Sequence, residues 1–210
     1  MLHHQPRAYR LELGLNLRAA VLVGTRWRNR YFPLENALVD VTKPDRPQPA
    51  WFTHLRPGDR LSIRLVDISC LGEPSSRTTP TFPALVDLHF TTPDTGEATS
   101  PFVDPPRVWK LATEATPRWS PVYSRRREQR LATWDITGET PAGIPNPLVF
   151  APVDGEFAAF QLSVVLRVDR DPFSDFFVFD PEMIIGDTGG GPIYDDEDRD
   201  DGGASSASNR

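Results

Sequence analysis

The N-terminal part of the chain alternates between apolar and polar positions. From Tyr9 to Val23 every odd-numbered residue is apolar, whereas the even positions include Arg10, Glu12 and Asn16. Successive side chains of a β-strand point to opposite faces of a sheet, so a period of two predicts a half-buried strand. Gly14 argues against a helix here and is expected to mark a bulge or a bend in that strand.

Later segments repeat this pattern. Apolar residues alternate over 61–65, 84–90, 132–136 and 160–168, and in the second of these Val86 shares a face with Leu88. After Leu65 the apolar phase shifts to Val66 and Ile68, which predicts a β-bulge or a strand that passes between two sheets. The stretches 176–179 and 183–185 are apolar almost throughout and are predicted to be almost wholly buried.

Proline separates these segments. The chain contains 22 prolines, concentrated in turn-like stretches such as 42–49 and 137–147. Proline is tolerated between strands but interrupts helices, so little helix is expected. Closely spaced short strands with turn signals favour a sandwich or barrel. The predicted fold is an all-β, antiparallel β-sandwich of jelly-roll type over residues 1–186.

The last part of the chain, residues 187–210, differs in composition. It contains seven acidic residues against Arg199 and Arg210, so it carries five of the six net negative charges of the chain. A glycine-rich, like-charged segment with little to bury is predicted to be a disordered tail. The preceding body, residues 1–186, is therefore nearly neutral, with a net charge of −1.

Cysteine content and hydropathy bear on location. The only cysteine, Cys70, fits a buried residue in a reducing compartment. The N-terminus lacks the pattern of a secretory signal, and no apolar run approaches the ~20 residues that span a bilayer. A cytoplasmic protein that does not insert in a membrane is expected.

Motifs for catalysis or cofactors are absent from the sequence. No nucleophile elbow, phosphate-binding loop or dinucleotide fingerprint is present. His54 and His89 could meet Asp87 at a metal, but no paired-ligand spacing preorganises such a site. Carboxylates from distant strands could also meet for hydrolysis, and the candidates in strand-like contexts are Asp40, Asp67, Asp87 and Asp135. The prediction is a non-catalytic protein with no metal and no cofactor.

A basic cluster follows two aromatic residues in the middle of the chain. Arg125, Arg126 and Arg127 come shortly after Trp119 and Tyr123. Arginine with aromatic residues can bind nucleic acid, but a near-neutral body and an anionic tail oppose phosphate binding. The cluster is instead a candidate contact for the acidic tail, weak and sensitive to salt.

Tryptophan supplies the remaining candidates for binding. Trp134 lies in an alternating segment and is predicted to be a core residue, whereas Trp27 and Trp51 lie near predicted turns. An amphipathic ring near a turn can line a pocket or an interface. Trp27, Trp51 and Trp109 are therefore candidate binding residues, with ordinary core packing as the alternative.

Two stretches resemble a known family. Residues 55–69 (LRPGDRLSIRLVDIS) contain a Gly-Asp pair followed by an alternating strand, and residues 157–186 end in an aromatic strand that closes in Asp-Pro. Both are similar to bacterial inclusion-body proteins of the AidA/PixA type. The resemblance implies a compact cytoplasmic β-sandwich, not an enzyme, that self-associates or accumulates.

Two hypotheses about function follow. The first is a non-catalytic β-sandwich that binds copies of itself or another protein, with the acidic tail limiting aggregation or docking on a basic surface. The second is a jelly roll that binds a small molecule or carbohydrate, or hydrolyses one. A pocket lined by tryptophans with two facing carboxylates would favour the second, and a filled interior would oppose it.

Overall fold

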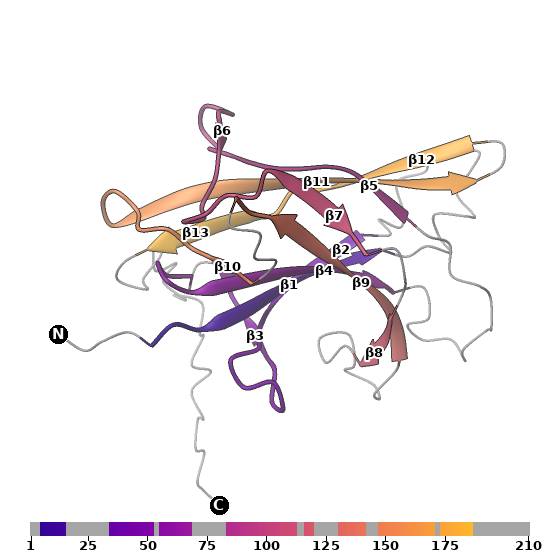
Figure 1. The fold of residues 1–210 in the computed structure, drawn as a ribbon, viewed down its shortest axis with the longest axis horizontal. Helices are drawn as coiled ribbons and strands as arrows, with labels where there is room; N and C mark the ends of the chain where they lie inside the picture. The colour runs from indigo at the N-terminus through magenta and orange to yellow at the C-terminus, as the bar shows by residue number, and fades with distance from the viewer. Residues whose placement is uncertain are drawn as a thin grey trace, which may run out of the picture.

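The computed structural model describes residues 5–15, 34–52, 55–68, 83–112, 116–119, 130–141, 147–170 and 173–186. Within these residues the structure consists of strands and contains no α-helix, which confirms the low helix content expected from the prolines (Figure 1). It follows that no helix in this part of the chain is long and apolar enough to cross a membrane.

The strands form two sheets. The larger has eight strands in the order β3-β2-β1-β4-β9-β7, with β10 paired to β4 and β8 paired to β9. Its strands are β1 (Ala8–Leu15), β2 (Leu34–Asp40), β3 (Gln48–Ala50), β4 (Arg60–Asp67), β7 (Val108–Leu111), β8 (Thr116–Trp119), β9 (Arg130–Glu139) and β10 (Leu148–Val149). The smaller has five strands in the order β12-β11-β5-β6, with β13 paired to β11. Its strands are β5 (Pro83–Thr91), β6 (Ala98–Thr99), β11 (Phe157–Arg170), β12 (Phe173–Phe179) and β13 (Glu182–Gly186).

The larger sheet is mixed and not antiparallel as predicted. Strands β1 and β4 run parallel, with Tyr9 opposite Leu61 and Leu15 opposite Asp67. Parallel neighbours require a crossover connection, and here β2 and β3 lie between β1 and β4 in the chain. The alternation of apolar residues within a strand is the same for either direction, so it could not reveal this pairing. The pairings in the smaller sheet are antiparallel.

One hydrophobic core lies between the two layers (Figure 1). The odd-numbered residues of β1 are buried in it, as the alternation predicts, and so is Trp134 of β9. From the opposite sheet, the long strand β11 contributes its even-numbered residues from Phe160 to Val168 to the same core. Burial of apolar surface contributes roughly 25 cal/mol per Å², so these alternating faces are the main source of stability.

The predicted irregularities of β1 and β4 are not observed. Gly14 pairs in unbroken register with Glu35 of β2 and Val66 of β4. Leu65 and Val66 point to opposite faces of the sheet, yet both side chains are buried. The apolar residues change phase after Leu65 because both faces of the sheet are buried at this point, and not because the strand contains a bulge.

A bulge does occur in the smaller sheet, at a position that the sequence did not indicate. Val165 of β11 faces Asp87 of β5, but the next residue, Leu166, faces Leu85. Val86 is the extra residue, and it turns away from the core while Leu85 packs against it. The expectation that Val86 shares the face of Leu88 is wrong, because one inserted residue reverses the alternation.

Candidate interaction surface

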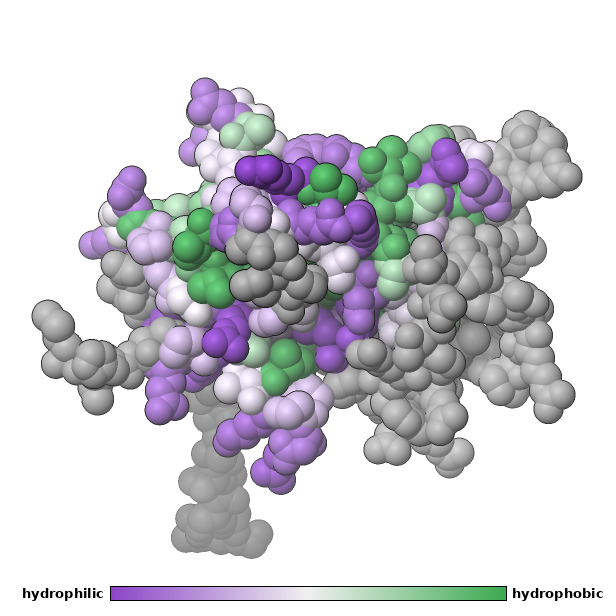
Figure 2. Space-filling view, viewed as in Figure 1, coloured by the Kyte–Doolittle hydropathy of each residue, from purple (hydrophilic) through white to green (hydrophobic). Residues whose placement is uncertain are grey.

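Apolar side chains are exposed on the outer face of the five-stranded sheet. Phe176 and Val178 of β12 are 60% and 49% exposed, and Val86 of β5 is 52% exposed. With half-buried Val165 of β11 these residues are called the apolar band. Figure 2 shows hydrophobic residues gathered where β5 and β12 lie, at the upper right, with hydrophilic residues around them. The prediction that 176–179 is almost wholly buried is therefore wrong for every second residue.

Strand register brings the members of the apolar band together. Val178 lies directly opposite Val165, and Phe176 lies opposite Arg167. Val165 in turn faces Asp87, next to the bulged Val86. Directly opposed side chains on one face of a sheet have Cβ atoms roughly 4.5–5.5 Å apart. Residues far apart in sequence thus form one strip across three strands.

Polar groups border the apolar band at both ends. At one end the Arg167 guanidinium lies 3.0 Å from the Asp169 carboxylate, which also accepts a hydrogen bond from the Ser174 hydroxyl at 2.7 Å. At the other end His89 Nδ1 lies 2.7 Å from Asp87 Oδ2. An apolar strip with a polar rim is typical of an interaction site.

The candidate tryptophans do not share a site. Trp51 follows β3 at one edge of the eight-stranded sheet and is 71% exposed. Trp109 is in β7 at the opposite edge of the path, half-buried, with its ring centroid 6.3 Å from that of Phe90. Trp27 lies outside the described residues, as do Arg125, Arg126, Arg127 and the tail 187–210. Of the two candidate tryptophans that the structure describes, Trp51 is exposed and Trp109 is half-buried.

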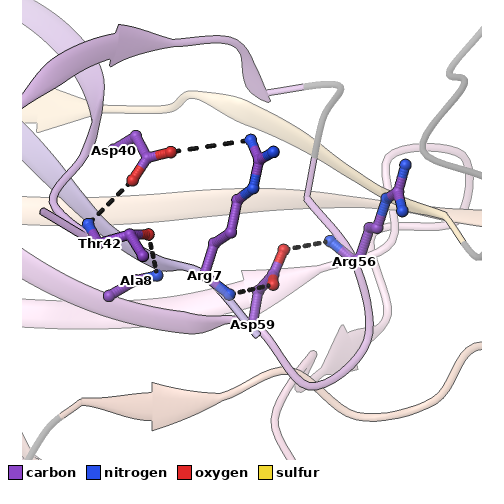
Figure 3. A network of polar contacts seen from close by, with 6 residues as sticks. All are labelled: Arg7, Ala8, Asp40, Thr42, Arg56 and Asp59. Atoms are coloured by element: carbon purple, nitrogen blue, oxygen red, sulfur yellow. Dashed lines mark hydrogen bonds and ion pairs between the residues drawn. The ribbon is translucent and has the colours of Figure 1, made fainter. Parts of the chain in front are cut away.

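The Gly-Asp pair of the family-like stretch forms a turn that anchors the N-terminus. Gly58 has a φ of +86°, which glycine adopts without strain. The buried Asp59 carboxylate accepts hydrogen bonds from the backbone N–H groups of Arg7 (2.8 Å) and Arg56 (3.0 Å), as Figure 3 shows. Asp59 therefore fixes the entry to β1 beside the start of β4, which is a structural role.

A second carboxylate continues this polar network on β2. Asp40 accepts a hydrogen bond from the backbone N–H of Thr42 and lies 3.8 Å from the Arg7 guanidinium (Figure 3). Tyr9 is buried nearby. Its burial raises the pKa of the phenol above the ordinary value of 10.0, and the negative charge of Asp59 raises this pKa further.

Charged pairs also lie on the outward face of the eight-stranded sheet. Arg10 contacts buried Glu12 at 2.7 Å within β1, and Arg64 of β4 contacts Asp135 of β9 at 2.7 Å. Glu12 and Asp135 both lie directly opposite Arg64 in the strand register. This row could not be predicted from the sequence, because its members come from three strands.

The remaining candidate groups can be placed only in part. His89 is paired with Asp87, and His54 lies outside the described residues. Among the described residues no group of three or more His, Cys, Asp or Glu side chains is placed to hold a metal ion. Asp40 and Asp135, two of the candidate acids, are each engaged with an arginine.

The chain was compared with known protein families, curated proteins and solved structures. No protein-family model, no curated protein and no solved structure matches this chain.

Proposed function

We propose that this chain is a cytoplasmic, non-catalytic β-sandwich protein that associates with copies of itself through the apolar band. The exposure of Phe176 and Val178 on β12 and of Val86 on β5, on either side of half-buried Val165 of β11, carries the proposal. Monomeric proteins rarely expose contiguous apolar patches larger than a few hundred Å², and larger patches with a polar rim usually mark contacts. The family-like stretches 55–69 and 157–186, similar to self-associating inclusion-body proteins, point the same way.

The association is expected to be weak and to depend on concentration. Stable interfaces bury about 800 Å² on each partner, and the apolar band consists of four side chains. The near-neutral charge of residues 1–186 keeps repulsion between two bodies low. Such a protein exchanges between monomer and assembly as its concentration changes.

The test is sedimentation or light scattering from about 1 to about 500 µM. The wild type is expected to gain mass with concentration, and the double variant Phe176→Thr/Val178→Thr is expected to stay monomeric. Threonine keeps the preference for strand while removing apolar surface. The matched control is Val103→Thr/Val149→Thr, which changes two exposed valines away from the apolar band. A wild type that is monomeric throughout this range would refute the proposal.

A second candidate function rests on Trp51. This ring is 71% exposed at an edge of the larger sheet, where it could stack on a sugar or a small molecule. Titration with a panel of soluble oligosaccharides, followed by tryptophan fluorescence, tests this function. Binding that Trp51→Ala abolishes would support it, and the absence of any response would refute it.

A further inference from the structure

Among the described residues, strand β12 forms an edge of the five-stranded sheet. It ends the strand order β12-β11-β5-β6, and within the described residues β11 is the strand to which it pairs. The outer side of an edge strand presents backbone N–H and C=O groups to solvent, and these can pair with another strand. The apolar band includes two residues of this same edge.

The other edges of the described sheets are short or blunted. Strand β5 pairs with β6 at Phe90 and Thr91, and its earlier part begins with Pro83 and carries the bulge at Val86. Strands β3 and β6 have three and two residues, and β3 contains Pro49. Strand β7 has four residues and carries Lys110. Strand β13 has its outer side partly taken, since Gly186 N–H donates to the Leu55 carbonyl at 3.0 Å. These are the usual devices that prevent edge pairing.

Strand β12 has none of these devices over its second half. It spans seven residues, and its stretch Phe176–Phe179 contains neither charge nor proline. Phe176 and Val178 point outward, while Phe177 and Phe179 point toward the core. A long apolar edge of this kind is a template for pairing with a further strand.

The sequence of β12 is self-complementary in one antiparallel register. If two copies pair about a twofold axis at Phe177, then Phe176 of each copy lies opposite Val178 of the other. Aromatic residues opposite β-branched residues are favourable cross-strand pairs. The same register places Asp180 opposite Ser174, so no two carboxylates face each other. A register centred on Phe176 would instead place Val178 opposite the Ser174 hydroxyl.

We propose that β12 pairs antiparallel with β12 of a second copy, centred on Phe177. The two five-stranded sheets then become one sheet, and the two apolar bands become one band across the twofold axis. This inference rests on the proposed self-association and identifies the strand that carries it. A second copy fits better than a charged peptide, because Phe176–Phe179 offers no charge to recognise. Main-chain hydrogen bonds along the edge add to the small area of the side chains.

The first test compares two lysine variants on the same face of the sheet. Val178→Lys places a charge on the edge strand β12, whereas Val86→Lys places one on β5, which is separated from β12 by β11. Edge pairing predicts that Val178→Lys weakens dimerisation about tenfold or more, while Val86→Lys changes it less than about twofold. Circular dichroism and the unfolding midpoint of both variants establish that they are folded.

The second test uses cross-linking at the β12 edge and does not depend on charge. In a Cys70→Ser background, the double variant Phe176→Cys/Val178→Cys is expected to form a covalent dimer under mild oxidation. Opposed residues of antiparallel strands lie within disulfide reach, about 4.4–6.8 Å between Cα atoms. Val86→Cys in the same background is expected to remain monomeric in non-reducing electrophoresis.

The outcomes separate this inference from the proposed function. Equal weakening by both lysine variants, together with cross-linking through Val86→Cys, would show that two sheet faces stack, and would overturn edge pairing while leaving self-association intact. A dimer that neither lysine disturbs would also overturn it. A wild type that is monomeric at every concentration would refute the proposed function and this inference together.

Discussion

At the scale of single residues, packing over Gly138 shows how closely the edge of the larger sheet is fitted. A Cβ atom built on Gly138 would lie 2.4 Å from Cγ and 2.6 Å from Cβ of Pro106, and 3.2 Å from a ring atom of Trp109. Distances below 3.0 Å require the neighbour to move. Glycine at position 138 therefore lets Pro106 and Trp109 cover β9 directly.

We expect Gly138→Ala to lower the free energy of unfolding by about 1–3 kcal/mol, the usual cost of overpacking. Urea denaturation followed by tryptophan fluorescence measures this change. The neighbouring exchange Thr137→Ala, at a half-buried position, is the control and is expected to cost less. Equal effects of the two variants would contradict the close contact with Pro106.

Tyr9 links stability to alkaline pH. Its pKa is raised in the folded state by burial and by Asp59, so the unfolded chain loses the phenolic proton at a lower pH. Stability contributed by Tyr9 is thus fully present below pH 10 and is lost as the pH rises through the folded-state pKa. Tyr9→Phe is expected to reduce the slope of unfolding free energy against pH above about 10. Parallel slopes for both proteins would contradict this assignment.

At the scale of elements, the turn 56–59 joins β4 to the start of β1. The Asp59 carboxylate accepts two backbone N–H groups, and the Arg60 N–H donates to the Arg7 carbonyl at 2.8 Å. The parallel pairing of β1 and β4 begins at this point, with Ala8 opposite Arg60. Asp59 therefore helps to fix the parallel pairing of β1 with β4. A tight turn cannot fix this pairing, because it connects antiparallel strands that follow each other in the chain.

We expect Asp59→Ala to cost about 2–4 kcal/mol, because two N–H groups lose their acceptor. Asp59→Asn keeps one acceptor oxygen and should have a smaller effect. Thermal or urea unfolding measures both, with Asp94→Ala in an exposed turn as the control. Asp59→Ala that unfolds like the wild type would exclude this role of the turn.

The strands differ in how far their sequences predicted them. The alternation in β1, β9 and β11 identified the inward residues correctly, because one face of each strand meets the core. The same reasoning failed at Val86, where one bulged residue reverses the faces, and at Phe176 and Val178. An apolar run such as 176–179 looks the same whether or not another layer covers its second face. The apolar band therefore could not be predicted from the sequence.

At the scale of the whole molecule, charge is separated from the described fold. Residues 187–210 carry five of the six net negative charges, and residues 1–186 carry a net charge of −1. Two bodies with an exposed apolar band approach each other with little repulsion, whereas two tails repel. The like charges of residues 187–210 are therefore expected to limit association, and salt should weaken that effect.

We expect a chain ending at Gly186 to associate at lower concentration than the full chain in low salt. The difference should shrink at about 0.5 M salt, where the Debye length falls to about 4 Å. Light scattering of both chains across salt concentrations measures this effect. A difference that persists in high salt would indicate a role of the tail other than repulsion.

Period-two patterning and proline spacing act locally, so the strands and the low helix content of the described residues could be predicted from the sequence alone. The residues of β1 and β11 that face inward, and the location of the net charge, also follow from the sequence. The folded structure was needed to show that β1 runs parallel to β4 and that β12 lies at an edge with Phe176 and Val178 exposed. Strand order, and whether the second face of a strand is buried, depend on contacts between segments that are distant in the sequence. The alternation of apolar residues within one strand does not reveal these contacts.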